Sequence, residues 1–327
     1  MPTSVDSPDW ITVQAILNTI GQNSWSNTTA LPQTAAFGSS LIYRGYVYLF
    51  GGIDNGSPAA TVYYAPINAN GTIGTWATTT ALPAAIYNTS ACVYNGFIYI
   101  IGGYTGTVSV STVYYAAVNS NGTIGAWNTT TAMPAVLNAV MSICQDGYIY
   151  MLGGTNTTTP VANTYYAAIA ADGTIGAWTA GTALPVGNAS AGIFTYHNSI
   201  YIVGGAGLLP GGVSGAYSSV YSVPITSTGA LGTWISLAGL PEPRQATVAT
   251  IVNGVAYVIC GENNAVGSNQ LYWTQLNSDG TIGQWNIGNN LPVTNYAHTG
   301  GSYNGVLYML GGQQNGSTSA LTWFAQV

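Results

Sequence analysis

Charged side chains are nearly missing from this chain of 327 residues. Asp, Glu, Lys and Arg make up 3% of it, against about 25% in an ordinary soluble protein. There is no lysine, and Arg44 and Arg244 are the two arginines. Because phosphate binding needs clustered lysine and arginine, this composition excludes a nucleic-acid partner.

Long apolar runs are missing too. No uninterrupted run reaches the roughly 18 residues that a membrane-spanning helix needs, so we expect no membrane insertion. Residues 1–9 have neither the basic segment nor the apolar segment of a signal peptide, and we expect none in this sequence.

Cysteine is scarce, and three cysteines are too few for a disulfide framework. Cys92 and Cys144 fall in the expected inner strands of adjacent repeats, where we interpret them as small buried apolar side chains. Cys260 replaces the first glycine of a glycine pair. None of the three has His or acidic neighbours in the sequence, so we predict no metal site and no cofactor.

What the chain has instead is one unit repeated six times, with paired glycines at intervals of 51, 51, 51, 56 and 51 residues. Most units contain an apolar strand that ends in the glycine pair, a Tyr-rich strand, an Asn-Gly or Asp-Gly turn, and a strand with Trp that closes on Leu-Pro. The alternation of side chains indicates β-strands, and the turns supply the positive φ that tight hairpins need. A repeat of this length indicates one closed array rather than two domains.

The first strand of each unit is built from small residues, as in Ser90-Ala91-Cys92, Ser190-Ala191-Gly192 and Gly300-Gly301-Ser302. Small side chains allow six strands to approach one common axis, and neighbouring units must stack to bury their Trp, Tyr and aliphatic residues. We therefore predict an all-β fold, a six-bladed β-propeller with four strands in each blade.

Paired glycines after an apolar strand, followed by a Tyr-bearing strand and then a Trp, resemble the kelch repeat over nearly the whole chain. The resemblance implies a kelch-like propeller of the secreted or surface type. The chain departs from the family in lacking most basic residues at the inner-strand starts, and in the longer Gly-rich hairpin before each Trp.

The two ends of the chain complement each other. Residues 22–32 supply a fourth strand without a glycine pair, and residues 297–327 supply three strands, so we predict that the last blade is closed by the N-terminal strand. Residues 18–327 then form one propeller, and residues 1–17 form an extension with a surplus strand. That strand, which includes Trp10, Ile11, Val13 and Ile16, either packs outside the last blade or pairs with an exposed strand of another subunit.

Six polar residues are the candidate binding site. Aligned on the repeat, the position of Ile86 becomes polar in the last three copies. The candidates are Asn188, Arg244 and Asn295 at that position, with Glu242, Tyr296 and His298 nearby. Many kelch proteins bind partners through such rim residues, which is what the resemblance implies here. The alternative is an exposed Arg-Glu pair beside a solvated His.

Catalysis has little support in the sequence, and we predict no catalytic residues. His197 and His298 are expected on opposite faces, which weakens a copper site like that of kelch-like galactose oxidase and removes a Ser-His-Asp triad. Among the acids, Glu242 and Glu262 share the expected rim. The enzyme alternative is a carbohydrate-active one, either a sugar isomerase resembling kelch sialate mutarotase or a glycan hydrolase.

The polar turns and the N-glycosylation acceptors favour an extracellular or cell-surface location. Candidate acceptors are Asn27, Asn55, Asn70, Asn88, Asn121, Asn128, Asn156, Asn188 and Asn315. We expect a non-enzymatic binding, adhesion or filament-forming module whose partner is a glycan, a surface protein or another copy of itself. With so few titrating groups, its stability should depend little on pH.

Overall fold

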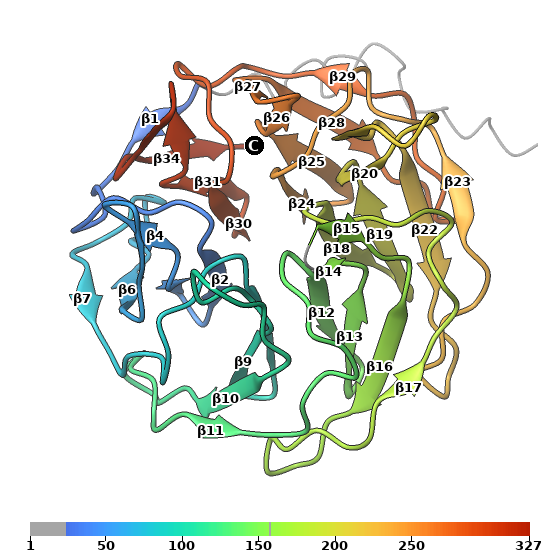
Figure 1. The fold of residues 1–327 in the computed structure, drawn as a ribbon. Helices are drawn as coiled ribbons and strands as arrows, with labels where there is room; N and C mark the ends of the chain where they lie inside the picture. Colours follow the sequence, from blue (N-terminus) through green and yellow to red (C-terminus); the bar gives the residue numbers. More distant parts are fainter. Residues whose placement is uncertain (1–23, 157) are drawn as a thin grey trace, which may run out of the picture.

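The computed structural model describes residues 24–156 and 158–327, and all of its regular structure is β. Six four-stranded antiparallel sheets stand around a central axis as the blades of a propeller (Figure 1). The predicted fold class is therefore confirmed. The described part of the chain contains no helix long and apolar enough to span a membrane.

Each blade runs outward from the axis in the order of its strands, with the small-residue strand innermost (Figure 1). Blade 1 contains β2 (Ser39–Tyr43), β3 (Tyr46–Phe50), β6 (Val62–Pro66) and β7 (Ala77–Thr78). Blade 2 contains β8 (Ser90–Tyr94), β9 (Phe97–Ile101), β10 (Val113–Ala117) and β11 (Asn128–Thr129). Blade 3 contains β12 (Met141–Gln145), β13 (Tyr148–Leu152), β16 (Thr164–Ala168) and β17 (Thr179–Ala180). Blade 4 contains β18 (Gly192–Tyr196), β19 (Ser199–Val203), β22 (Val220–Pro224) and β23 (Ile235–Leu237), and blade 5 contains β24 (Val248–Val252), β25 (Val255–Ile259), β28 (Leu271–Gln275) and β29 (Asn286–Ile287).

Blade 6 is assembled from both ends of the described chain, as predicted. It contains β30 (Thr299–Tyr303), β31 (Val306–Leu310), β34 (Thr322–Gln326) and β1 (Ser26–Asn27). Ser26 pairs with Phe324 and Asn27 with Trp323, which places the N-terminal strand at the outer edge (Figure 1). This strand is shorter than the sequence suggested. Residues 1–17, with Trp10, Ile11, Val13 and Ile16, lie outside the described residues, so the predicted domain boundary stays a prediction.

A short hairpin follows each glycine pair, and we call these six the crown hairpins. In blade 2 the hairpin forms through a single bridge between Tyr104 and Ser109. The other five are β4 (Ile53–Asp54) with β5 (Ser57–Pro58), β14 (Thr155–Asn156) with β15 (Thr159–Pro160), β20 (Ala206–Leu208) with β21 (Ser214–Ala216), β26 (Glu262–Asn263) with β27 (Val266–Gly267), and β32 (Gln313–Gln314) with β33 (Ser317–Thr318). Because strands alternate in direction, these hairpins share one face with the loops that join the blades.

Aromatic side chains link neighbouring blades. Tyr48 in β3 is fully buried, and its hydroxyl donates a 2.8 Å hydrogen bond to the carbonyl of Gly122 in the hairpin of blade 2. The Trp before each outer strand donates its indole N–H to a backbone carbonyl of the preceding blade, at 2.9 to 3.1 Å. The six are Trp25, Trp76, Trp127, Trp178, Trp234 and Trp285. A buried aromatic therefore covers apolar area and satisfies its polar atom in the same contact.

The apolar core lies between blades rather than within one. Leu82 and Ile86, at the end of blade 1, pack with Ile98 and Ile100 of blade 2. Each interface thus needs both neighbours, which is why the unit is stable only in an array.

The interpretation of two cysteines as separate apolar side chains is wrong. Cys92 in β8 and Cys144 in β12 form a disulfide between the inner strands of blades 2 and 3. They occupy nearly equivalent repeat positions, 52 residues apart against a repeat of 51, so neighbouring inner strands bring their sulfurs together. Cys260 is free and buried.

Candidate functional site

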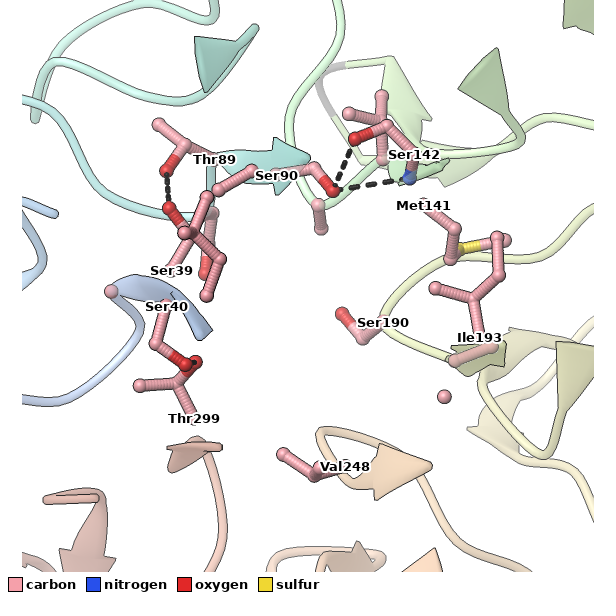
Figure 2. A pocket seen from close by; sticks show the side chains of 18 of the residues that line it. Ser39, Ser40, Thr89, Ser90, Met141, Ser142, Ser190, Ile193, Val248 and Thr299 are labelled. Carbon is pink, nitrogen blue, oxygen red and sulfur yellow. Dashed lines mark hydrogen bonds between the residues drawn. The ribbon is translucent and has the colours of Figure 1, made fainter. Parts of the chain in front are cut away.

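The six inner strands surround an open cavity of about 440 Å³ on the propeller axis. Figure 2 shows its two unlike sides. Hydroxyl side chains of Ser39, Ser40, Thr89 and Thr299 gather on one side, from blades 1, 2 and 6. Apolar side chains dominate the other side, where Met141, Ile193 and Val248 come from blades 3, 4 and 5.

The hydroxyls of the polar side are paired across blade boundaries. Ser39 and Thr89 lie 2.9 Å apart between their hydroxyl oxygens, and Ser40 and Thr299 lie 2.6 Å apart (Figure 2). Ser142 donates its hydroxyl to Ser90 at 2.7 Å and its backbone N–H at 3.0 Å. These contacts and the nearby disulfide join blades 6, 1, 2 and 3 along the cavity.

A ring of backbone hydrogen bonds encircles the cavity where each chain segment enters its inner strand. In each blade one residue donates its N–H to the carbonyl of the equivalent residue in the preceding blade, at 2.8 to 3.2 Å. The ring runs through Phe37, Asn88, Ala139, Ser190, Ala246 and Ala297 and closes on itself. All six have φ between 49° and 56°, yet none is a glycine.

His298 follows the last ring residue and is 7% exposed, so the alternative of a solvated His is wrong. Neither ring nitrogen makes a hydrogen bond of normal geometry to a described residue. Burial lowers the pKa of His298 from its ordinary 6.5 to about 4, and the carbonyl of Ile259 offsets only part of this effect. The imidazole is therefore neutral at pH 7. It is the one titratable side chain among the described residues that line the cavity, apart from the disulfide cysteines.

Arg244 is 3% exposed, and its two terminal nitrogens are hydrogen-bonded inside the protein, whereas its buried Nε has no hydrogen-bond partner among the described residues. One terminal nitrogen donates to Glu242 at 2.8 Å, to Gln270 and, at 3.3 Å, to the Tyr272 hydroxyl, while the other donates to the Pro243 carbonyl. The guanidinium also lies 5.6 Å from the centre of the Tyr272 ring. Glu242 remains 56% exposed at its side chain. The Arg-Glu pair of the alternative interpretation therefore exists, but its cation is buried between blades 4 and 5 rather than exposed, and it does not line the cavity.

Asn188 and Asn295 have equivalent structural contacts. Both are buried, and each donates its Nδ2 to the carbonyl of the first glycine in the next blade, Gly204 at 2.9 Å and Gly311 at 2.7 Å. The alignment with Ile86 is correct, because the backbone carbonyl at each of these positions also accepts a hydrogen bond from the second glycine of the preceding blade. The buried Asn188 is inaccessible as a glycosylation acceptor in the folded chain.

The remaining rim residues lie apart from the cavity lining. Tyr296 is half-buried and forms a bridge with Gln313 at the crown hairpin of blade 6. Glu262 accepts a 2.9 Å hydrogen bond from Gln245, and its burial raises the pKa of its carboxyl. The structure thus brings Arg244 and Glu242 into contact and leaves the six candidates distributed over three blade boundaries, so their role in binding stays a prediction.

The cavity hydroxyls were not among the predicted site residues, although Ser and Thr recur at the start of several inner strands. The backbone ring was not predicted either, because Phe, Asn, Ser and Ala all occupy it and it has no side-chain signature. Within the part of the chain that the structure covers, no three His, Cys, Asp or Glu side chains are close enough to hold a metal ion.

Comparison with known proteins agrees with this architecture. No protein-family model matches the chain. Beta-scruin of Limulus polyphemus is 27% identical over 258 residues, which cover 72% of this chain and 26% of that protein. Kelch-like protein 23 of Mus musculus is 26% identical over 155 residues, which cover 47% of this chain and 26% of that protein. The solved structure titled "Structure of YjhT" superposes with a TM-score of 0.71 and 14% identity, covering 91% of this chain and 96% of that chain.

The chain is a six-bladed propeller whose repeats are similar to those of kelch-repeat proteins. The low identity to the solved structure supports the fold alone. This kelch propeller spans about a quarter of the length of the curated relatives described above, so their whole-protein activities do not transfer to it directly.

Proposed function

We propose that this kelch propeller is a non-enzymatic module that binds a protein partner through its crown hairpins, outside the cell or on a cell surface. The kelch-repeat relatives support a binding or structural module in general. The crown face as the contact surface and the location are specific to this proposal.

The observation that carries the proposal is a group of exposed apolar side chains at the crown of blades 4 and 5, which we call the apolar crown patch. Leu208 and Val213 are 51% and 64% exposed on the longest crown hairpin, and Val266 is 70% exposed on the next one. Strands β21 and β26 of these two hairpins contact each other. Apolar side chains gathered on one exposed surface favour a protein interface.

The disposition of the charges agrees with such a surface. Arg244, the cation among the candidates, is already paired with Glu242 and buried. A partner at the apolar crown patch would therefore meet no unpaired arginine or lysine, and the nearby Glu262 is half-buried and bonded to Gln245, so recognition there depends more on shape and apolar contact than on ion pairs.

The disulfide supports the extracellular part of the proposal. Disulfides persist in oxidising compartments and are rare where thiols are kept reduced. Cell fractionation with non-reducing peptide mapping of the native protein tests this part. A cytosolic protein with free thiols at Cys92 and Cys144 would refute it.

Crown binding is tested with two matched variants on intact source cells. The first variant combines Leu208→Ser, Val213→Ser and Val266→Ser. It should bind at least about tenfold more weakly, because it lacks three apolar side chains that the complex would bury. The control Ile235→Ser with Ile287→Ser removes side chains that are 52% and 59% exposed on the outer strands of the same blades. Equal binding by both variants, or a loss confined to the control, would contradict the crown assignment.

Self-association stays a separate part of the proposal. The surplus strand with Trp10, Ile11, Val13 and Ile16 would pair with an outer strand of another copy. Deleting residues 1–17 should abolish oligomers in analytical ultracentrifugation and leave thermal unfolding nearly unchanged. Oligomers that survive the deletion would rule out this strand as the contact.

A further inference from the structure

The hairpins that join the third and fourth strands lie on the face opposite the crown, and two of them contain glycosylation acceptors. Asn70-Gly71-Thr72 belongs to blade 1 and Asn121-Gly122-Thr123 to blade 2. Both asparagines are exposed. The equivalent hairpins of blades 3 and 5 contain Asp172 and Asp279 in the same place.

The acceptor amide and the hydroxyl of its Thr are already in contact. Thr72 donates its hydroxyl to Oδ1 of Asn70 at 2.7 Å and its backbone N–H at 3.1 Å. Asn68 in turn donates its Nδ2 to the Thr72 hydroxyl at 2.9 Å. The hairpin of blade 2 repeats these contacts at 2.7, 3.1 and 2.9 Å. No described residue accepts a hydrogen bond from Nδ2 of either Asn70 or Asn121.

The aspartate hairpins show what the fold requires at this position. Asp172 accepts from the N–H and hydroxyl of Thr174 at 3.0 and 2.7 Å, and Asp279 accepts from Thr281 at 2.9 and 2.7 Å. An acceptor oxygen is therefore sufficient for the hairpin, and the Nδ2 of an asparagine adds no contact to it. Asn70 and Asn121 are exposed residues, and within the described part of the chain their Nδ2 contributes no hydrogen bond to the hairpin.

We propose that Asn70 and Asn121 are N-glycosylated and that this face of the propeller carries sugar while the crown remains open. In the reaction, Nδ2 loses a proton to a base of the transferase and bonds to C1 of an oligosaccharide. The bond between C1 and the donor's phosphate oxygen breaks, and the lipid diphosphate of the donor leaves. The inference rests on the proposed extracellular location, because such donors and transferases act on secreted and surface proteins.

The modification would compensate for the composition of the chain. Charged side chains keep most protein surfaces solvated and apart, but here 8 acidic and 2 basic residues, with a formal net charge of −6, are spread over 327 residues. Bulky sugars at the hairpins of two adjacent blades would solvate that face without any charge. The apolar crown patch lies on the opposite face and would stay accessible to its partner.

Glycopeptide mass spectrometry of the native protein, purified from its source cells, tests the proposal. Peptides with Asn70 and Asn121 should carry sugar at most copies, and the peptide with the buried Asn188 should carry none. Asn70→Asp with Asn121→Asp keeps the acceptor oxygen seen at Asp172 and should fold normally with two fewer sugars. Asp172→Asn creates the same triplet in the matching hairpin and should gain one sugar.

The outcomes separate this inference from the proposed location. Surface protein with an intact Cys92–Cys144 disulfide but unmodified Asn70 and Asn121 would overturn the inference and leave the location standing. Sugar confined to the crown acceptors Asn55 and Asn315 would overturn it too. Thr72→Ser should keep the sugar and Thr72→Val should lose it at Asn70 alone, whereas sugar retained on the Val variant would contradict recognition of this hydroxyl.

Discussion

The backbone N–H of Phe37 donates a 2.9 Å hydrogen bond to the carbonyl of Ala297, a residue 260 positions later in the chain. This contact joins blade 1 to blade 6 and completes the ring of six peptide groups around the axis. Each member has a left-handed backbone, which costs an L-residue about 1–2 kcal/mol relative to the right-handed conformation. Hydrogen bonds that polarise one another around a closed ring offset this cost.

Glycine at a ring position should stabilise the protein, because it adopts positive φ without steric cost. In Ala139→Gly and Ala246→Gly we expect the free energy of unfolding to rise by up to about 1 kcal/mol, because the relieved backbone strain exceeds the additional conformational entropy that glycine loses on folding. Urea unfolding measures this free energy. Ala256→Gly, inside β25 and fully buried, should instead lower the free energy of unfolding. A loss of stability in all three variants would show that the ring residues are not strained.

The sequence predicted the repeat, the four-stranded blades and the closure of blade 6, because these depend on local patterns that recur in register. Gly-Gly, Asn-Gly and Trp each recur at a repeat position where one structural requirement explains the choice of residue. The site was less predictable. Arg244 and His298 were expected near the solvent-exposed rim, but both are buried. Whether a polar side chain at an inner position faces solvent or the neighbouring blade depends on its side-chain conformation, which the spacing of residues in the sequence does not determine. The disulfide depends on a one-residue stagger between two blades.

Reduction of the Cys92–Cys144 disulfide should lower the free energy of unfolding by about 2–4 kcal/mol, because the bond closes a loop of 52 residues in the unfolded chain. The measurement is urea unfolding with and without dithiothreitol. Cys92→Ser with Cys144→Ser should match the reduced protein and no longer respond to the reductant. Cys260→Ala should respond as the parent does, because Cys260 has no disulfide. An unfolding curve that is the same in both conditions would contradict a stabilising bond.

Acid should destabilise the protein through His298, contrary to the expectation of little pH dependence. The pKa of the folded state, about 4, lies below the ordinary 6.5 that applies to the unfolded chain. The unfolded state therefore binds the proton first, and stability falls as the pH drops from about 6.5 to about 4. The full loss is about 3 kcal/mol, since each unit of pKa difference corresponds to about 1.4 kcal/mol. Unfolding by urea at several pH values should show this slope in the parent and in His197→Gln, whose site is an exposed turn, but not in His298→Gln.

Arg244→Leu separates a structural role from a binding role at the predicted rim. The repeat places Ile86 and Leu137 at the equivalent position, where both are buried, so an apolar side chain fits there. Replacing a buried ion pair by a well-packed apolar residue is often neutral or stabilising by about 1–4 kcal/mol, and Glu242 stays solvated when its partner is removed. We therefore expect unchanged or increased stability in urea unfolding. Arg244→Ala, which leaves a cavity beside Tyr272, should lower the free energy of unfolding by about 2–4 kcal/mol.

If the apolar crown patch is the contact surface, Arg244→Leu binds cells as tightly as the parent. A stable Arg244→Leu protein that no longer binds would instead assign recognition to the guanidinium, because the fold would have retained a costly buried charge for that purpose.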